Sequence, residues 1–178
     1  MSELGKKEMI DALFDHATEG ILIADANGKI LLINPSAEKM FGFLSNELYG
    51  ESIEILIPDQ LKHQHKINRE SYSQKPNARP MGLGLDLKAK RKDGSLFPVE
   101  ISLSPLKKDN EQLFIAFIID ISIRKQIEES VREKQKELEK IAAVLIATNE
   151  ELEKKVSDRT QILQEAILEL EHSRNELT

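Results

Sequence analysis

The sequence predicts an α+β fold, in which an antiparallel β-sheet with short flanking helices precedes a long C-terminal helix that forms a parallel coiled coil. Two observations favour the sheet. β-rich runs surround Asn27-Gly28 and Asp93-Gly94, and both dipeptides tolerate the positive φ angles of tight hairpin turns. A third observation favours the helix, because all 8 glycines and 6 prolines precede Gln126, after which Glu, Lys, Gln and spaced aliphatic residues dominate.

Composition argues against several classes of function. The formal net charge of -6 and the absence of Trp disfavour a nucleic-acid partner, which would require a basic surface to neutralise phosphates. The absence of Cys excludes disulfides and thiolate metal sites. No apolar run approaches the roughly 18 residues of a membrane span. We therefore expect a cytoplasmic chain without membrane contact.

Residues 1–20 are predicted to form an N-terminal amphipathic helix or cap, which Gly20 can end. One face of this helix carries four apolar residues at the i, i+3, i+4, i+7 spacing: Ile10, Leu13, Phe14 and Ala17. We expect this face to cover the outer side of the sheet.

The next elements follow from turn and cap residues. The runs ILIAD and KILLIN form the strands of the first hairpin, and Asn34-Pro35 then begins a short helix, because Asn caps helix N-termini and Pro suits the first helical position. Short helices and loops are expected from Leu44 to Gln74, and strands return after Pro80. The apolar run from Leu113 to Ile121 predicts a central strand covered on both faces.

Four motifs, in this order, resemble those of a PAS domain, and together they span about Leu13 to Arg124. They are Gly20-Ile-Leu-Ile-Ala-Asp, Ile33-Asn-Pro-Ser-Ala-Glu, Arg91-Lys-Asp-Gly-Ser-Leu-Phe-Pro-Val-Glu-Ile-Ser-Leu-Ser and Phe117-Ile-Ile-Asp-Ile-Ser. The resemblance implies a five-stranded antiparallel sheet whose helical flank encloses a ligand-sized cavity, which a small molecule could occupy. We accordingly divide the chain into a cap (1–20), a PAS domain (21–123) and a coiled-coil signalling linker (124–178).

The join between the last strand and the long helix resembles a PAS signalling element. Asp120-Ile121-Ser122 stands where the family commonly has Asp-Ile-Thr ahead of a signalling helix. The hydroxyl of Ser122 can cap the helix, and Asp120 is close enough in sequence to Arg124 for a contact across the join. We predict that Asp120, Ile121, Ser122 and Arg124 transmit a signal. The alternative is that Asp120 and Ser122 are ordinary capping residues.

Residues 124–178 are predicted to pair as a parallel dimer. A heptad register runs through the segment, with core positions at Val131, Leu138, Ala142, Leu145, Asn149, Leu152, Val156, Leu163 and Leu170. Asn149 at position a is typical of parallel dimers, and Arg159 at position d is a second polar position. An unpaired helix about 80 Å long would leave its apolar stripe exposed, so we expect a homodimer. The alternative is a single helix whose Asn149 and Arg159 face solvent.

The segment from Glu150 to Leu163 also resembles the linker helix that precedes the kinase core of bacterial sensor histidine kinases. His172 lacks the sequence that follows a phosphoacceptor histidine, and there is no Gly-rich nucleotide loop. We therefore expect no catalysis by the chain itself, and we expect an output domain C-terminal to Thr178 in a longer parent protein.

His65 is the candidate cofactor ligand, and no metal site is predicted. Counted from Pro58, His65 falls where haem-binding PAS domains of oxygen-sensing kinases carry their iron ligand, and Gly82-Leu-Gly84 resembles their next strand. Leu85, however, stands where those sensors place an Arg over bound oxygen. A His on a Lys-rich helix also suits a solvated residue or a hydrogen-bond partner. Three hypotheses remain: a sensory dimerisation module, a haem-based gas sensor and a ligand-free dimerisation scaffold.

Overall fold

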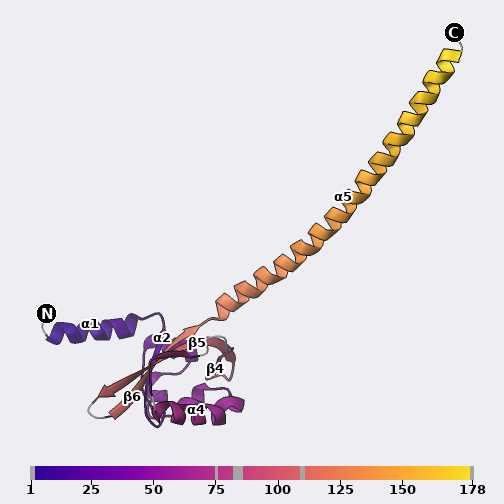
Figure 1. Ribbon diagram of the computed structural model, residues 1–178. Helices are drawn as coiled ribbons and strands as arrows, with labels where there is room; N and C mark the ends of the chain where they lie inside the picture. The colour runs from indigo at the N-terminus through magenta and orange to yellow at the C-terminus, as the bar shows by residue number, and fades with distance from the viewer. Residues whose placement is uncertain (1–2, 75, 82–85, 109–110, 177–178) are drawn as a thin grey trace. The chain divides into compact units, whose positions relative to one another are not determined.

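The computed structural model describes residues 3–74, 76–81, 86–108 and 111–176. The chain divides into two compact units after Lys125. The first unit holds the described strands and short helices, and the second is most of one long helix (Figure 1).

The first unit is built on an antiparallel sheet in the order β2-β1-β6-β5-β3. Its strands are β1 (Gly20–Asp25), β2 (Ile30–Ile33), β3 (Arg79–Met81), β4 (Lys88–Lys90), β5 (Leu96–Lys108) and β6 (Glu111–Asp120). Both β3 and β4 pair with β5, the former near Ile101 and the latter near Phe97, while β6 takes the other edge of β5. β3 and β4 therefore share one position, and the sheet is five strands wide, as predicted.

Both predicted hairpin turns are present, and each depends on a glycine. Gly28 lies between β1 and β2 with φ 81°, and Gly94 lies between β4 and β5 with φ 84°. Their backbone N–H groups donate to the carbonyls of Asp25 (3.0 Å) and Arg91 (2.9 Å), which closes the turns. Residues with a Cβ rarely adopt these φ values, so glycine is required at both positions.

The helices are α1 (Glu3–His16), α2 (Pro35–Phe41), α3 (Ser45–Leu48), α4 (Lys62–Gln74) and α5 (Ser122–Glu176), with 3-10 turns η1 (Ile53–Leu56) and η2 (Asp59–Leu61). Asn34 caps α2 as predicted, because its side-chain oxygen accepts a hydrogen bond from the Ala37 N–H at 2.9 Å. Pro35 occupies the first turn, where its missing N–H leaves no bond unmade.

The hydrophobic core lies on one face of the sheet. Along β6, alternate residues Phe114, Ala116 and Ile118 are buried, whereas Phe117 and Ile119 are 38% and 44% exposed. The prediction of a central strand is confirmed, because β6 lies between β1 and β5. The prediction that both of its faces are covered is wrong, because the outer face retains exposed apolar side chains.

The predicted N-terminal helix forms, but it does not cover the sheet. Its residues Ile10 and Leu13 are more than half exposed. The end of α1 and the residue that follows it are bound to the start of α2: the Phe14 carbonyl accepts from Asn34 Nδ2 (3.2 Å), and the Ala17 carbonyl accepts from Ser36 Oγ (2.5 Å). These bonds hold α1 against α2, so the expectation that α1 shields the outer face is wrong.

The second unit continues α5, which runs for 55 residues without a break (Figure 1). It contains neither Gly nor Pro, so nothing in its sequence interrupts the ladder of backbone hydrogen bonds. Among the described residues, no helix combines the length and the apolar character needed to cross a membrane.

Candidate functional site

The join between β6 and α5 is organised by Asp120. Its Oδ1 accepts hydrogen bonds from the backbone N–H of Ser122 (2.8 Å) and from the Ser122 hydroxyl (2.5 Å). The Lys125 N–H already donates to the Ile121 carbonyl at 2.9 Å, so helical hydrogen bonding starts directly after the strand. Ile121 is buried beneath the join. The strand therefore continues into the helix without an intervening loop.

The predicted capping role of Ser122 is wrong in its chemistry. The Ser122 hydroxyl donates to Asp120 instead of accepting from a first-turn N–H. The carboxylate of Asp120 is the acceptor, because its position two residues earlier lets it reach both the N–H and the hydroxyl of Ser122.

The second carboxylate oxygen of Asp120 binds Arg91, which the sequence analysis did not select. Oδ2 lies 2.7 Å from Arg91 Nη2, and the Arg91 guanidinium lies 3.7 Å from the centre of the Phe97 ring. Arg91 also donates to the Met40 carbonyl near the end of α2. One guanidinium thus links α2, the β4–β5 hairpin and the join.

The predicted contact between Asp120 and Arg124 is wrong, because Arg124 binds Glu100 on β5. Glu100 pairs with Ile119 across the sheet, so its carboxylate lies beside the start of α5. The next residue, Lys125, similarly binds Asp86, which precedes β4. The first turn of α5 is therefore attached to the sheet by two cationic side chains.

Asp120 is ionised at neutral pH. Burial raises the pKa of its carboxyl, but hydrogen bonds from the hydroxyl and N–H of Ser122 and from Arg91 outweigh this and hold the pKa below its usual value. The contact with Arg91 is therefore an ion pair, with both side chains about a quarter exposed.

The predicted coiled-coil residues form an exposed apolar stripe on α5. Val131, Leu138, Leu145, Leu152, Val156 and Leu163 are each between 53% and 68% exposed, and Ala142 is exposed as well. Asn149 is exposed and donates to Glu153 one turn later, at 3.4 Å. Leu170 lies on the helix, but its side chain is outside the described part of the structure.

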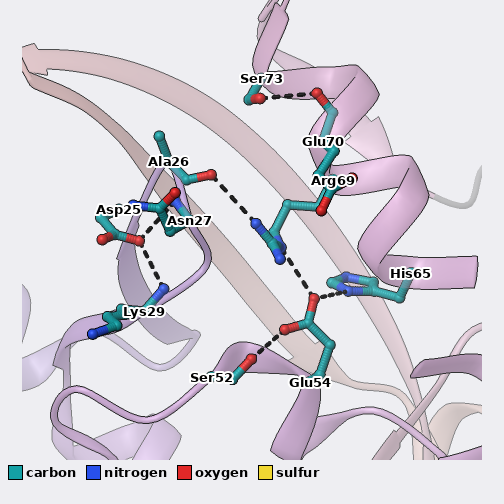
Figure 2. Close-up of polar contacts among 10 residues, drawn as sticks. All are labelled: Asp25, Ala26, Asn27, Lys29, Ser52, Glu54, His65, Arg69, Glu70 and Ser73. Carbon is teal, nitrogen blue, oxygen red and sulfur yellow. Dashed lines mark hydrogen bonds and ion pairs between the residues drawn. The ribbon is translucent and has the colours of Figure 1, made fainter. Parts of the chain in front are cut away.

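His65 belongs to a polar cluster between α4 and η1 (Figure 2). Its Nδ1 lies 3.2 Å from Glu54 Oε1, and the same oxygen accepts a hydrogen bond from Arg69 Nε at 3.0 Å. The other oxygen of Glu54 accepts from the Ser52 hydroxyl. Arg69 also donates to the Ala26 carbonyl in the β1–β2 turn, at 3.3 Å. His65 is therefore a hydrogen-bond partner of Glu54 and not merely a solvated residue.

The donor chemistry of His65 also fits an axial ligand of haem. Metal-ligating histidines commonly hold a carboxylate with one ring nitrogen, and Glu54 takes Nδ1 and leaves Nε2 for a metal. Among the described residues there is no group of three His, Cys, Asp or Glu side chains that could hold a metal ion by themselves. The segment from Gly82 to Leu85 holds both the resemblance at Gly82-Leu-Gly84 and the departure at Leu85, and it lies outside the described residues.

Replacing Glu54 by Gln should lower the free energy of unfolding by about 2 kcal/mol near neutral pH, since Ser52, His65 and Arg69 lose a charged acceptor. Burial alone would raise the pKa of Glu54, but bonds from Ser52, Arg69 and His65 outweigh it and lower the pKa to about 2. A depressed folded pKa stabilises the fold above the ordinary value of 4.5, and this stabilisation is lost as the pH falls toward 2.

The difference in unfolding free energy between the wild type and E54Q, measured by urea denaturation, should therefore shrink between about pH 6 and about pH 3. The exposed Glu111, whose side chain makes no hydrogen bond or ion pair with the described residues, provides the matched control E111Q. A difference for E54Q that stays constant across this range would show that its ionisation is not coupled to folding.

Comparisons with known proteins agree with this fold. The family model described as the PAS fold matches residues 8–121. The chain is 30% identical over 122 residues to the sensor protein FixL of Bradyrhizobium diazoefficiens, 29% over 131 residues to the oxygen sensor protein DosP of Escherichia coli, and 26% over 133 residues to the sensor histidine kinase TmoS of Ectopseudomonas mendocina.

These alignments cover 67%, 69% and 74% of the chain but only 24%, 16% and 13% of the respective relatives. Among solved structures, the PAS domain of an HTR-like protein from Haloarcula marismortui superimposes with a TM-score of 0.56 at 22% identity, over 66% of this chain and 93% of that one. The matched residues contain the hairpins, the capped helix α2 and all of β6. The chain belongs to the PAS fold family.

Proposed function

We propose that the chain is a cytoplasmic PAS sensory module that forms a homodimer through α5 and passes a conformational signal along a parallel coiled coil to a C-terminal output domain. The observation that carries this proposal is the exposed apolar stripe on α5, which belongs to a helix that begins directly at the join.

Pairing with a second helix would bury the exposed apolar stripe of α5. Burying one Leu or Val side chain contributes about 1.5–3 kcal/mol, and no element among the described residues covers the stripe. A second copy offers an identical stripe, and Asn149 among the apolar positions favours a parallel, in-register pair.

The join supplies the route from sheet to helix. Movement of the sheet changes the distance between Arg91 and Asp120, and between Arg124 and Glu100, and so applies force to the first turn of α5. Because a coiled-coil seam has discrete packings, a small displacement can shift the population between two of them.

A histidine kinase is the output domain that we infer. The relative TmoS is a sensor histidine kinase, and the segment from Glu150 to Leu163 resembles the linker helix of such kinases. In this proposal the chain itself performs no catalysis and binds no nucleic acid. Its role is to sense, to dimerise and to transmit.

Replacing Asp120 by Ala in a parent protein that includes the output domain should change basal output or the response to stimulus several-fold, because the join loses its cap and its ion pair. Arg91→Ala should act in the same direction, and the double variant should match D120A, since both changes break one link. Asp11→Ala, on exposed α1, is the matched control. Unchanged output and response in D120A would refute a signalling role for the join.

A second candidate function is haem-based gas sensing, in which His65 Nε2 would hold the iron and the haem would supply the gas-binding site. The carboxylate-anchored His65 and the relationship to an oxygen sensor favour it. Protein loaded with hemin should then show a sharp Soret band that His65→Ala abolishes and that His63→Ala, two residues earlier on α4, retains. Absence of the band would exclude this candidate.

A ligand-free dimerisation scaffold remains the alternative to a sensor. A small molecule recovered with the natively purified protein by mass spectrometry would contradict the scaffold hypothesis, whereas a dimer that releases nothing would support it.

A further inference from the structure

A positively charged cleft lies between the β1–β2 turn, η1 and α4. It has a volume of about 380 Å³, is open to solvent, and is lined by Asn27, Ser52, Glu54, Lys62, His63, Lys66 and Arg69. Three of these residues are cations and one is a carboxylate, in a chain whose formal net charge is -6. The cleft therefore concentrates positive charge on a protein that is acidic as a whole.

The carboxylates near the cleft cancel only part of this charge. Both oxygens of Glu54 are occupied by the contacts of the polar cluster, and its low pKa keeps it ionised as the counter-charge of Arg69. Lys62 binds Asp59 at 2.6 Å, but Asp59 also binds Lys90 at 2.8 Å, so one carboxylate serves two cations.

Two residues at the rim of the cleft, His63 and Lys66, carry side-chain hydrogen-bond donors that a ligand could use. Within the described part of the chain, neither Lys66 nor His63 makes a hydrogen bond or an ion pair, and both are exposed on α4. They are three residues apart in the sequence, so they lie on the same side of the helix, toward the β1–β2 turn.

The floor of the cleft is held rigidly. A Cβ at Gly28 would lie 2.6 Å from Arg69 Nε, so the guanidinium packs directly against the turn backbone. Nε donates to Glu54 and Nη1 donates to the Ala26 carbonyl, while Nη2 makes no bond with the described residues. Arg69 is only 14% exposed, so its orientation is set by these contacts before any ligand arrives.

We propose that this cleft binds a small, multiply charged oxyanion, either a phosphate monoester or a dicarboxylate. Lys66 and His63 would contact the anion from the rim, and Arg69 Nη2 and the Asn27 amide would contact it from the turn. A cavity of about 380 Å³ lies at the lower end of ligand-binding pockets and exceeds the size of a lone phosphate ion. The proposal does not depend on dimerisation or on the output domain.

The test is a titration of the purified chain with inorganic phosphate and, separately, with succinate, followed by isothermal calorimetry and by amide chemical shifts at low ionic strength. We expect binding with shifts centred on α4 and the β1–β2 turn. The double variant His63→Gln/Lys66→Gln should weaken binding at least about fivefold, because neutral amides replace the Lys66 ammonium and the His63 imidazole at the rim. Succinamide, which is uncharged, should not bind.

Lys39→Gln is the matched control, because Lys39 is an exposed lysine on α2 that does not line the cleft. It should leave the dissociation constant unchanged.

Binding of phosphate alone would assign a phosphate monoester, and binding of succinate alone would assign a dicarboxylate. No shifts at the cleft up to about 10 mM of either anion, or equal weakening by K39Q, would overturn the proposal. The single variant K66Q alters only an exposed side chain and serves if the double variant is unstable.

Discussion

Replacing Leu145 and Leu152 together by Asp is expected to convert the protein from a dimer to a monomer at micromolar concentration. Both side chains lie on the exposed stripe of α5, at successive d positions of the heptad. In a paired seam each subunit would lose the burial of two leucines and would place two carboxylates against those of its partner. The combined loss of at least about 5 kcal/mol corresponds to a more than 10³-fold weaker dimer.

Sedimentation equilibrium or light scattering over a concentration series measures this change. The control variant carries Ala147→Asp and Gln161→Asp, which add the same number of negative charges at f positions on the opposite side of the helix. It should remain a dimer. A wild type that is monomeric at about 10 μM, or a leucine variant that stays dimeric, would remove the basis of the proposed signalling path.

Asn34→Ala should lower the free energy of unfolding by about 3 kcal/mol, the largest stability change expected in the first unit. The Asn34 side chain is fully buried and makes four bonds. Its oxygen accepts from the N–H of Ile21 (2.8 Å) and of Ala37 (2.9 Å), and its nitrogen donates to the carbonyls of Phe14 (3.2 Å) and Glu19 (2.9 Å). Alanine would remove the partner of all four backbone groups, of which the Ala37 N–H is buried and the others are partly buried.

Urea unfolding followed by circular dichroism at 222 nm is dominated by α5, so amide chemical shifts of the sheet should report the transition instead. Asn46→Ala, at an exposed position on α3 whose side chain makes no hydrogen bond with the described residues, should change stability by less than about 0.5 kcal/mol. A loss for N34A no larger than that for N46A would show that the buried amide is replaceable, for example by water.

Local features of the fold could be predicted because their causes lie within a few residues. Asn-Gly and Asp-Gly specify the two hairpins through glycine φ angles, and Asn34-Pro35 specifies the start of α2 through capping. The spacing of apolar residues after Gln126 likewise predicted one continuous helix. None of these inferences needed knowledge of distant contacts.

The partners at the join could not be predicted in this way, because they depend on strand register. Arg91 lies 29 residues before Asp120 and reaches it only because Val99 pairs with Asp120 across β5 and β6. The nearest cation along the chain, Arg124, was therefore the predicted partner. The Arg91-Lys-Asp-Gly motif could have indicated Arg91, because the hairpin that it forms leads into β5, the strand that pairs with β6.

The position of α1 shows the same limit. Its apolar spacing predicted a helix with one apolar face, but that pattern does not identify the surface on which the face lies. Hydrogen bonds from Asn34 and Ser36 decide this, and they hold the end of α1 at α2. The apolar residues Ile10 and Leu13 consequently remain in solvent.

Because β6 passes into α5 without a loop, the angular phase of the stripe around the helix axis is set by counting residues from Ser122. Each residue added or removed turns everything downstream by about 100°, whereas a block of seven returns it almost to its starting azimuth. If α5 is a coiled-coil linker as proposed, its length can therefore vary only in steps of seven residues without changing the azimuth of the stripe further along the helix.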